Sequence, residues 1–211
     1  MSKLKIYGVP ISRSISNIWA ALELGIEYEN VPIGWDDNSI YGDAYRKINP
    51  NRRVPAIQDG DFIMWESLAI NLYLVKKHGG SLAPTTLQED AHTLQWTLWA
   101  ATQLERPAMQ WAFNAFILEP HERRPEAAAK ALDELRPLLE VLEGQMAKTR
   151  YLLGDRFTVA DLNVGCVLLR PRQQLDLSNF AKLAAWDKAV FERPAAKRAW
   201  AIRVDAASKT G

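Results

Sequence analysis

Residues 48–70 read INPNRRVPAIQDGDFIMWESLAI, a sequence that predicts a β-hairpin leading into a helix. The short apolar run Ala56-Ile57 is followed by the polar turn Asp59-Gly60-Asp61 and by a second strand-like run at residues 62–65. Glu66-Ser67 then opens an apolar pattern that is typical of a helix. Because a helix N-terminus carries unpaired N–H groups and a partial positive charge, the sequence predicts a site for a carboxylate there.

The Val54-Pro55 step at the start of the hairpin suggests a second binding feature. Proline cannot donate a hydrogen bond to a sheet, so Pro55 belongs at a strand start or at an edge. We predict a cis bond between Val54 and Pro55, against the general preference of X–Pro bonds for trans. That geometry leaves the backbone groups of Val54 available to an extended peptide bound like an added strand.

Upstream of the hairpin, the pattern predicts a strand at Leu4–Tyr7, a helix at Ser14–Leu24 and a strand at Tyr28–Ile33. Gly25 is expected to end the helix as its C-cap. A strand, a helix and a strand in this order predict two parallel strands joined by a right-handed crossover. With the hairpin and its helix at Ser67–Lys77, the order is βαβββα, which matches the thioredoxin-like fold.

Beyond the Gly/Ser/Pro-rich residues 79–84 the strand signal disappears, so the fold class is α/β followed by all-α. We predict a thioredoxin-like domain at residues 1–79, a linker at 80–88 and an all-helical domain at 89–211. The helical domain is expected to contain a long helix kinked at Pro107, helices at 125–147 and 162–169, and a final helix from near Asn179. Thr158 and Asp161 have the spacing of a capping box.

The composition excludes several classes of function. The net charge is +1, from 26 basic and 25 acidic residues, so no electrostatic case arises for nucleic acid or for an anionic membrane. One cysteine, Cys166, gives neither a disulfide nor a redox pair, and three scattered histidines offer no metal cluster. The N-terminus reads directly as a strand, with no signal peptide or membrane span, so we expect a cytoplasmic protein.

The dipeptides Asn49-Pro50, Val54-Pro55 and Glu66-Ser67, in this order and at this spacing, resemble the glutathione-binding half of the cytosolic glutathione transferase family. The resemblance extends over essentially the whole chain, including the capping element at residues 151–161. The phrase Gly8-Val9-Pro10-Ile11-Ser12 is similar to the serine-type, bacterial-like members. Glutathione is therefore the implied co-substrate.

The reaction that this resemblance implies is attack of a thiolate on an electrophile. A free thiol has a pKa of about 8.5, so a hydrogen bond to the thiolate is needed to populate it at neutral pH. Ser12 is the predicted donor. Ser14, Arg13, Asn17 or a backbone N–H at the start of the first helix are alternatives. Tyr7 occupies the position used by tyrosine-type members, but we expect an ordinary strand residue.

For glutathione itself, the resemblance assigns the cysteinyl part to the backbone of Val54 and the γ-glutamyl end to Glu66 and Ser67. Arg53 is expected to reach the glycyl carboxylate. Ser12 and Ser67 are also candidate helix N-caps, and Glu66 is also readable as a solvated charge. Arg52 replaces a glycine that is common in the family, which puts the geometry of this loop in question.

The electrophile is expected to bind where the helical domain faces the first domain. Aromatic residues at helical spacing more often belong to a core than to a ligand site. The candidates lie on one long predicted helix and are Trp96, Trp99, Gln103, Arg106, Met109, Trp111 and Phe113. Trp35 and Tyr41 are candidates for the other side of the site.

The function that follows is conjugation of glutathione to small apolar electrophiles, with a role in detoxification. The alternatives are a non-catalytic binding or regulatory module, and a glutathione-dependent isomerase, dehalogenase or peroxidase. We also expect a homodimer in which one first domain meets the partner's helical domain, because Phe62, Met64 and Trp65 place apolar side chains on the hairpin.

Overall fold

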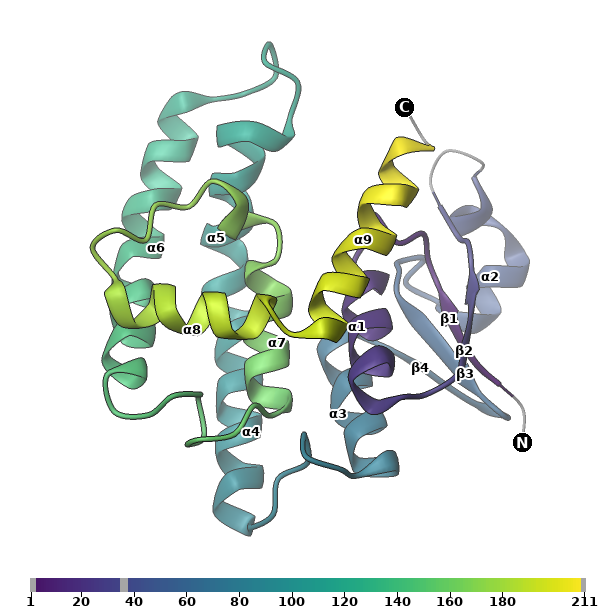
Figure 1. Cartoon of the computed structure of the whole chain (residues 1–211). Helices are drawn as coiled ribbons and strands as arrows, with labels where there is room; N and C mark the ends of the chain where they lie inside the picture. The colour runs from purple at the N-terminus through teal and green to yellow at the C-terminus, as the bar shows by residue number, and fades with distance from the viewer. Residues whose placement is uncertain (1–2, 35–37, 210–211) are drawn as a thin grey trace. The chain divides into compact units, whose positions relative to one another are not determined.

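The computed structural model describes residues 3–34 and 38–209. The chain forms two compact units (Figure 1). The first contains the described residues up to Leu82 together with those from Glu192 onward, and the second contains Ala83–Phe191. Each unit has its own core and is described separately.

The sheet of the first unit contains β1 (Leu4–Tyr7), β2 (Tyr28–Val31), β3 (Ala56–Asp59) and β4 (Phe62–Trp65), in the order β2-β1-β3-β4. β1 and β2 are parallel, with Leu4 opposite Tyr28, and the other two pairs are antiparallel. The predicted parallel pairing and hairpin are therefore confirmed, and the fold is thioredoxin-like.

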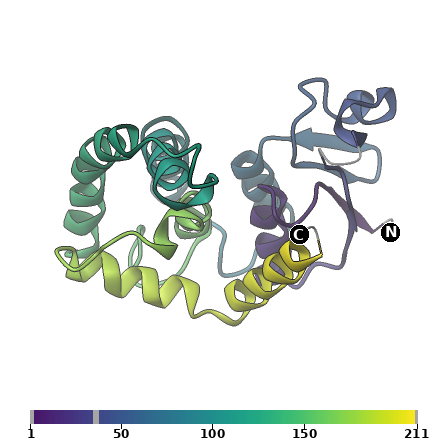
Figure 2. The ribbon, with the colours of Figure 1, turned by 90° about the horizontal axis from the view of Figure 1, so that it is seen from above.

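Helices cover both faces of this sheet (Figures 1 and 2). α1 (Ser14–Leu24) packs against α3 (Ser67–His78) and α9 (Pro194–Ser208), and its C-cap is Gly25, as predicted, with φ of 66°. The 3-10 turn η1 (Ser39–Tyr41) and α2 (Asp43–Ile48) contribute to a separate cluster on the other face. The largest buried side chains of the unit are Ile6, Ile18, Trp19, Ile40, Ile57, Ile70 and Leu74.

The C-terminal part differs from the sequence prediction, which expected one last helix and assigned residues 89–211 to the helical domain. Two helices are present, α8 (Ala181–Phe191) and α9, because Pro194 fits the first turn of a helix but not its interior. α9 belongs to the first unit. Arg193 donates from Nε and Nη2 to the two carboxylate oxygens of Glu23 on α1, at 2.8 and 2.7 Å.

Every regular element of the second unit, within its described residues, is helical. These elements are α4 (Leu87–Trp99), η2 (Ala100–Leu104), α5 (Glu105–Ala112), η3 (Phe113–Ile117), α6 (Pro125–Met146), α7 (Val159–Leu168), η4 (Pro171–Gln173) and α8. All residues of α7 are buried, including the free Cys166, so this helix forms the centre of the unit. No helix in the described part of the chain is long and apolar enough to cross a membrane.

The long helix expected around Pro107 is present but divided. A π-helical turn, η2, separates α4 from α5, and Pro107 lies in the first turn of α5. Proline removes the hydrogen bond to the carbonyl four residues earlier, which is Gln103 within η2. The wider π turn is one of the known ways for a helix to accommodate such a break.

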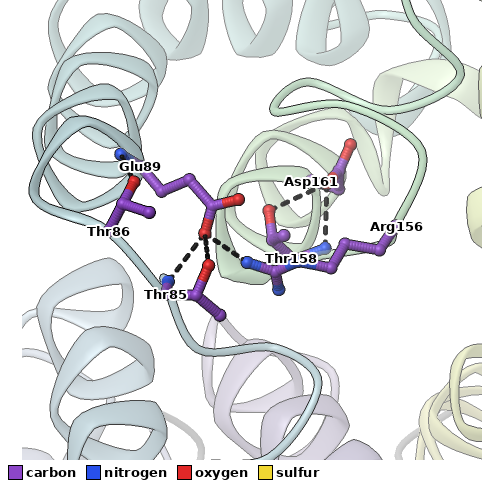
Figure 3. Close-up of polar contacts among 6 residues, drawn as sticks. All are labelled: Thr85, Thr86, Glu89, Arg156, Thr158 and Asp161. Atoms are coloured by element: carbon purple, nitrogen blue, oxygen red, sulfur yellow. Dashed lines mark hydrogen bonds and ion pairs between the residues drawn. The ribbon is translucent and has the colours of Figure 1, made fainter.

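Two capping networks fix the starts of α4 and α7 (Figure 3). Asp161 accepts hydrogen bonds from the N–H and the hydroxyl of Thr158, both at 3.0 Å, and from the N–H of Leu152 at 2.8 Å. The predicted capping box is confirmed, and Asp161 is structural. At the start of α4, Glu89 accepts from the N–H and hydroxyl of Thr85 at 2.7 and 2.9 Å and forms an ion pair with Arg156.

Candidate active site

The segment between β1 and α1 is held in place by a close approach at Gly8. Its φ is 129°, and a Cβ there would lie 3.0 Å from the Cβ atoms of both Ser14 and Val54 and 3.3 Å from the Ser12 Oγ. A side chain at this position is therefore excluded by both strain and space. The distance between Val54 Cβ and Ser12 Oγ cannot exceed the sum of their distances to that point, so the two predicted site residues are neighbours.

The two serine hydroxyls of this segment differ in accessibility. Ser12 Oγ donates to the Val9 carbonyl at 2.6 Å and lies 3.1 Å from Ser14 Oγ. Ser14 Oγ lies 2.8 Å from the Val9 carbonyl and 3.1 Å from the Gly8 carbonyl, and it is fully buried. Ser12 retains 6% of its accessible surface. Of the two hydroxyls, that of Ser12 is the less buried.

Other candidate donors have structural partners. Tyr7 donates from its hydroxyl to Gln58 Oε1 at 2.8 Å, and its ring packs near Tyr45 in the cluster beneath α2. Asn17 is fully buried, and its Nδ2 donates to the Ser67 carbonyl at 2.9 Å and to Asn71 Oδ1 at 2.7 Å. Asn17 therefore ties the first turn of α1 to the first residue of α3.

The loop before β3 is fixed through the carbonyl of Arg53. The Tyr45 hydroxyl and Asn49 Nδ2 both donate to this carbonyl at 2.7 Å. Burial raises the pKa of Tyr45 to about 12, so its hydroxyl remains a donor at neutral pH. The Val54–Pro55 bond is cis, as predicted. Between described residues, no hydrogen bond involves the N–H or C=O of Val54.

Arg52, which stands where a glycine is common in the family, has a backbone conformation that favours glycine. Arg52 adopts a φ of 51°, in the left-handed region that favours glycine. Arg52 therefore adopts, under strain, the turn that a glycine would adopt freely. Arg53, one residue later, is exposed to solvent.

Glu66 and Ser67 lie at the N-terminus of α3. Glu66 is the N-cap residue, with a strained φ of 77°, and Ser67 is the first helical residue, so Ser67 is not the cap. Likewise Arg13, not Ser12, is the N-cap of α1. The first α-helical bond of α3 runs from Ile70 N–H to the Glu66 carbonyl at 2.9 Å. The N–H of Ser67 precedes that bond and, with the partial positive charge of the helix, suits an anion.

The aromatic residues proposed for the electrophile divide between core and surface. Trp96 and Trp111 are buried and pack edge-on against Trp99 and Phe116 respectively, so they belong to the core of the second unit. Gln103 and Arg106 are exposed, and Trp99, Met109 and Phe113 are half-buried. Tyr41 in the first unit is exposed, and Trp35 lies outside the described residues.

Several residues that shape the site were not found from the sequence. The Tyr45 hydroxyl donates to the Arg53 carbonyl, Asn30 Nδ2 to the Gly8 carbonyl, and Arg203 Nη1 to the carbonyls of Pro10 and Ile11. Asn71 Oδ1 accepts from Asn17, which also holds the Ser67 carbonyl. A buried polar residue within an apolar helical run, such as Asn71, is the kind of signal that could have indicated them.

Comparison with known proteins shows the family to which the chain belongs. Two family models match: the one described as "Glutathione S-transferase, N-terminal domain" over residues 2–76, and the one described as "Glutathione S-transferase, C-terminal domain" over residues 104–194. Glutathione S-transferase 3 of Zea mays is 30% identical, over 92% of this chain and 92% of its own length. The chain belongs to the glutathione S-transferase family.

Solved structures give the same result. Glutathione S-transferase-I bound with lactoylglutathione matches with a TM-score of 0.88 at 29% identity, covering 95% of this chain and all of that one (100%). A theta class glutathione S-transferase from Xanthomonas axonopodis pv. citri, with glutathione bound, matches with a TM-score of 0.87 at 28% identity, over 94% and 97% of the two chains.

Proposed function

We propose that this protein is a glutathione transferase that joins the thiolate of glutathione to small apolar electrophiles. The observation that carries the proposal is the close approach at Gly8, which puts Ser12 beside Val54, in a chain that belongs to this family. A pure interaction module has no need of a reachable hydroxyl next to free backbone groups and a helix N-terminus.

The proposed binding mode follows the chemistry of each group. The backbone N–H and C=O of Val54 pair with the cysteinyl part of glutathione like an added strand. The N–H and hydroxyl of Ser67 take the γ-glutamyl carboxylate, and the Glu66 carboxylate takes the ammonium group. Arg53, exposed just before Val54, takes the glycyl carboxylate.

In the proposed reaction, Ser12 turns its proton from the Val9 carbonyl to the glutathione sulfur. The thiol proton leaves to solvent, and the hydrogen bond stabilises the thiolate that remains. The sulfur lone pair then forms the new carbon–sulfur bond, and a leaving group departs with its electron pair. Residues of the second unit, among them Trp99, Gln103 and Arg106, are proposed to receive the electrophile.

The decisive test measures glutathione binding by calorimetry and turnover with an activated aryl halide, a peroxide and an isomerisable unsaturated ketone. We expect conjugation of the aryl halide. Binding without any turnover would favour the non-catalytic module, and turnover confined to the peroxide or the ketone would favour the peroxidase or isomerase.

We further infer a cytoplasmic detoxification role and a homodimer. The dimer is supported by two exposed apolar surfaces, one in each unit. The first is on β4, where Ile63 and Trp65, two residues apart on one face of the strand, are 38% and 40% exposed. The second is on α4, where Leu87, Leu94 and Leu98 are exposed at spacings of seven and four residues, which align them on one helix face. Monomeric proteins rarely expose large apolar surfaces to solvent.

A further inference from the structure

The loop that leads to Ser12 is held through its carbonyl groups. The Gly8 carbonyl accepts from Asn30 Nδ2 at 2.8 Å, and the Val9 carbonyl accepts from the Ser12 N–H at 2.9 Å. The next two carbonyls, those of Pro10 and Ile11, both accept from Nη1 of Arg203. Consecutive carbonyls of an irregular segment are thus held by donors from β2, from the loop itself and from α9.

Arg203 lies in the second half of α9. α9 packs along α1 in both views of the molecule (Figures 1 and 2). Its first end is fixed by the ion pair between Arg193 and Glu23, and its second end reaches the Ser12 loop through Arg203. Arg203 is half-buried, so these hydrogen bonds are shielded in part from competing water.

The contact acts on the peptide unit that carries Ser12. The carbonyl of Ile11 and the N–H of Ser12 belong to the same planar amide, so a donor on that carbonyl fixes the orientation of both. A charged donor also polarises the amide and strengthens the hydrogen bond from the Ser12 N–H to the Val9 carbonyl. Without Arg203, water would replace the guanidinium and the loop would gain freedom at the point where the hydroxyl must meet the sulfur.

We propose that Arg203 is a positioning residue for thiol activation, which holds the Ser12 hydroxyl at the glutathione sulfur from the C-terminal helix. This inference rests on the proposed function, because it assigns the purpose of the contact to the Ser12–thiolate hydrogen bond. Displacement of a reacting group by about 1 Å is enough to cost up to about a hundredfold in rate.

The test uses the full chain with Arg203→Gln, Arg203→Lys and the matched control Arg193→Gln. The control makes the same change at the other end of the same helix, where it weakens packing on α1 without touching the loop. For Arg203→Gln we expect kcat to fall about tenfold and the thiol pKa in the binary complex to rise, with glutathione affinity changed less than about threefold. Arg203→Lys should recover most of the loss, because its ammonium can donate to both carbonyls.

Hydrogen exchange on the ligand-free protein separates this inference from the proposed function. Faster exchange at residues 12–16 in Arg203→Gln, and not in Arg193→Gln, is expected whether or not the protein turns over glutathione. Unchanged exchange would overturn the positioning role, as would equal losses of kcat in the two Gln variants. A wild-type protein that neither binds nor turns over glutathione would overturn the proposed function, and with it the catalytic purpose of the contact.

Discussion

At the residue scale, Ser12 carries the most direct prediction. Ser12→Ala should lower kcat about 10- to 100-fold, since a hydrogen bond to a charged group contributes about 1.5–3 kcal/mol. The pKa of bound glutathione should rise by about 1–2 pH units, followed by thiolate absorbance, with little change in affinity because the bond favours only the ionised form.

Tyr7→Phe is the control for Ser12→Ala, because it removes only the hydroxyl that donates to Gln58. The assignment would be wrong if Ser12→Ala kept wild-type turnover while Ser14→Ala, at matched stability, lost it. If all three variants stay active, a backbone N–H or Arg13 is the donor.

A second residue-scale prediction concerns Ser67. Ser67→Ala should weaken glutathione binding by about 1–3 kcal/mol, the cost of leaving a charged group without its partner. Glu66→Ala should weaken it as well, through the ammonium. Isothermal calorimetry measures both, and Ser178→Ala, at an exposed loop position of the second unit, is the control. Unchanged affinity in both site variants would remove these residues from the site.

The strained turn at Arg52 predicts a stabilising change. Arg52→Gly should increase the free energy of unfolding by about 0.5–1 kcal/mol, because glycine adopts the left-handed backbone without strain. The higher conformational entropy of glycine in the unfolded chain offsets part of this stabilisation. Denaturant titration measures it. Arg53→Gly, one residue away and without a positive φ, should give no such gain; equal stabilisation by both would contradict the explanation.

At the scale of elements, the sequence predicted those whose signals are local. Gly25 ends α1, Gly60 makes the hairpin turn with a φ of 64°, and Thr158 with Asp161 caps α7. The division of the last helix was missed, although Pro194 marks it. The packing of α9 on the first unit was not predictable, because it depends on the tertiary pairing of Arg193 with Glu23, far apart in the sequence.

The start of α4 predicts a pH dependence. The Thr85 N–H donates to the Glu89 carboxylate and, with Arg156, lowers its pKa from the usual value despite some opposing desolvation. A carboxyl group whose folded pKa is lowered contributes stability above its unfolded pKa of about 4.3, and this is lost as pH falls through the folded pKa.

In Glu89→Gln this contribution is absent, so the thermal unfolding midpoint should lie below wild type at pH 7, and the two should converge below about pH 4. Arg156→Gln should show the same convergence in part, since the Thr85 hydrogen bonds remain. A constant difference between Glu89→Gln and wild type from pH 7 to pH 3 would contradict the assignment.

At the scale of the whole molecule, the sequence predicted candidate site residues but not the contacts that hold them in place. The order of Val54-Pro55 and Glu66-Ser67 was enough to suggest the ligand. The close approach at Gly8, the bond from Asn17 to Ser67 and the donors on the Arg53 carbonyl are all contacts between separate elements. No local sequence pattern encodes such contacts, so the residues that hold the candidate site residues in place could not be predicted.

The last prediction concerns assembly. β4 and α4 each carry exposed apolar side chains, and a two-fold dimer that pairs one first unit with the partner's second unit would cover both sets twice. We expect a dimeric mass by light scattering at micromolar concentration, since a stable interface of this kind buries about 1,200–2,000 Å². Trp65→Glu and Leu98→Glu should each shift the mass to that of a monomer, because either change places a charge in an apolar interface. Val141→Glu, at an exposed apolar position on α6, is the control and should remain dimeric. A monomeric wild type, or a dimer unaffected by both interface variants, would show that these surfaces are covered by something other than a second copy of the chain.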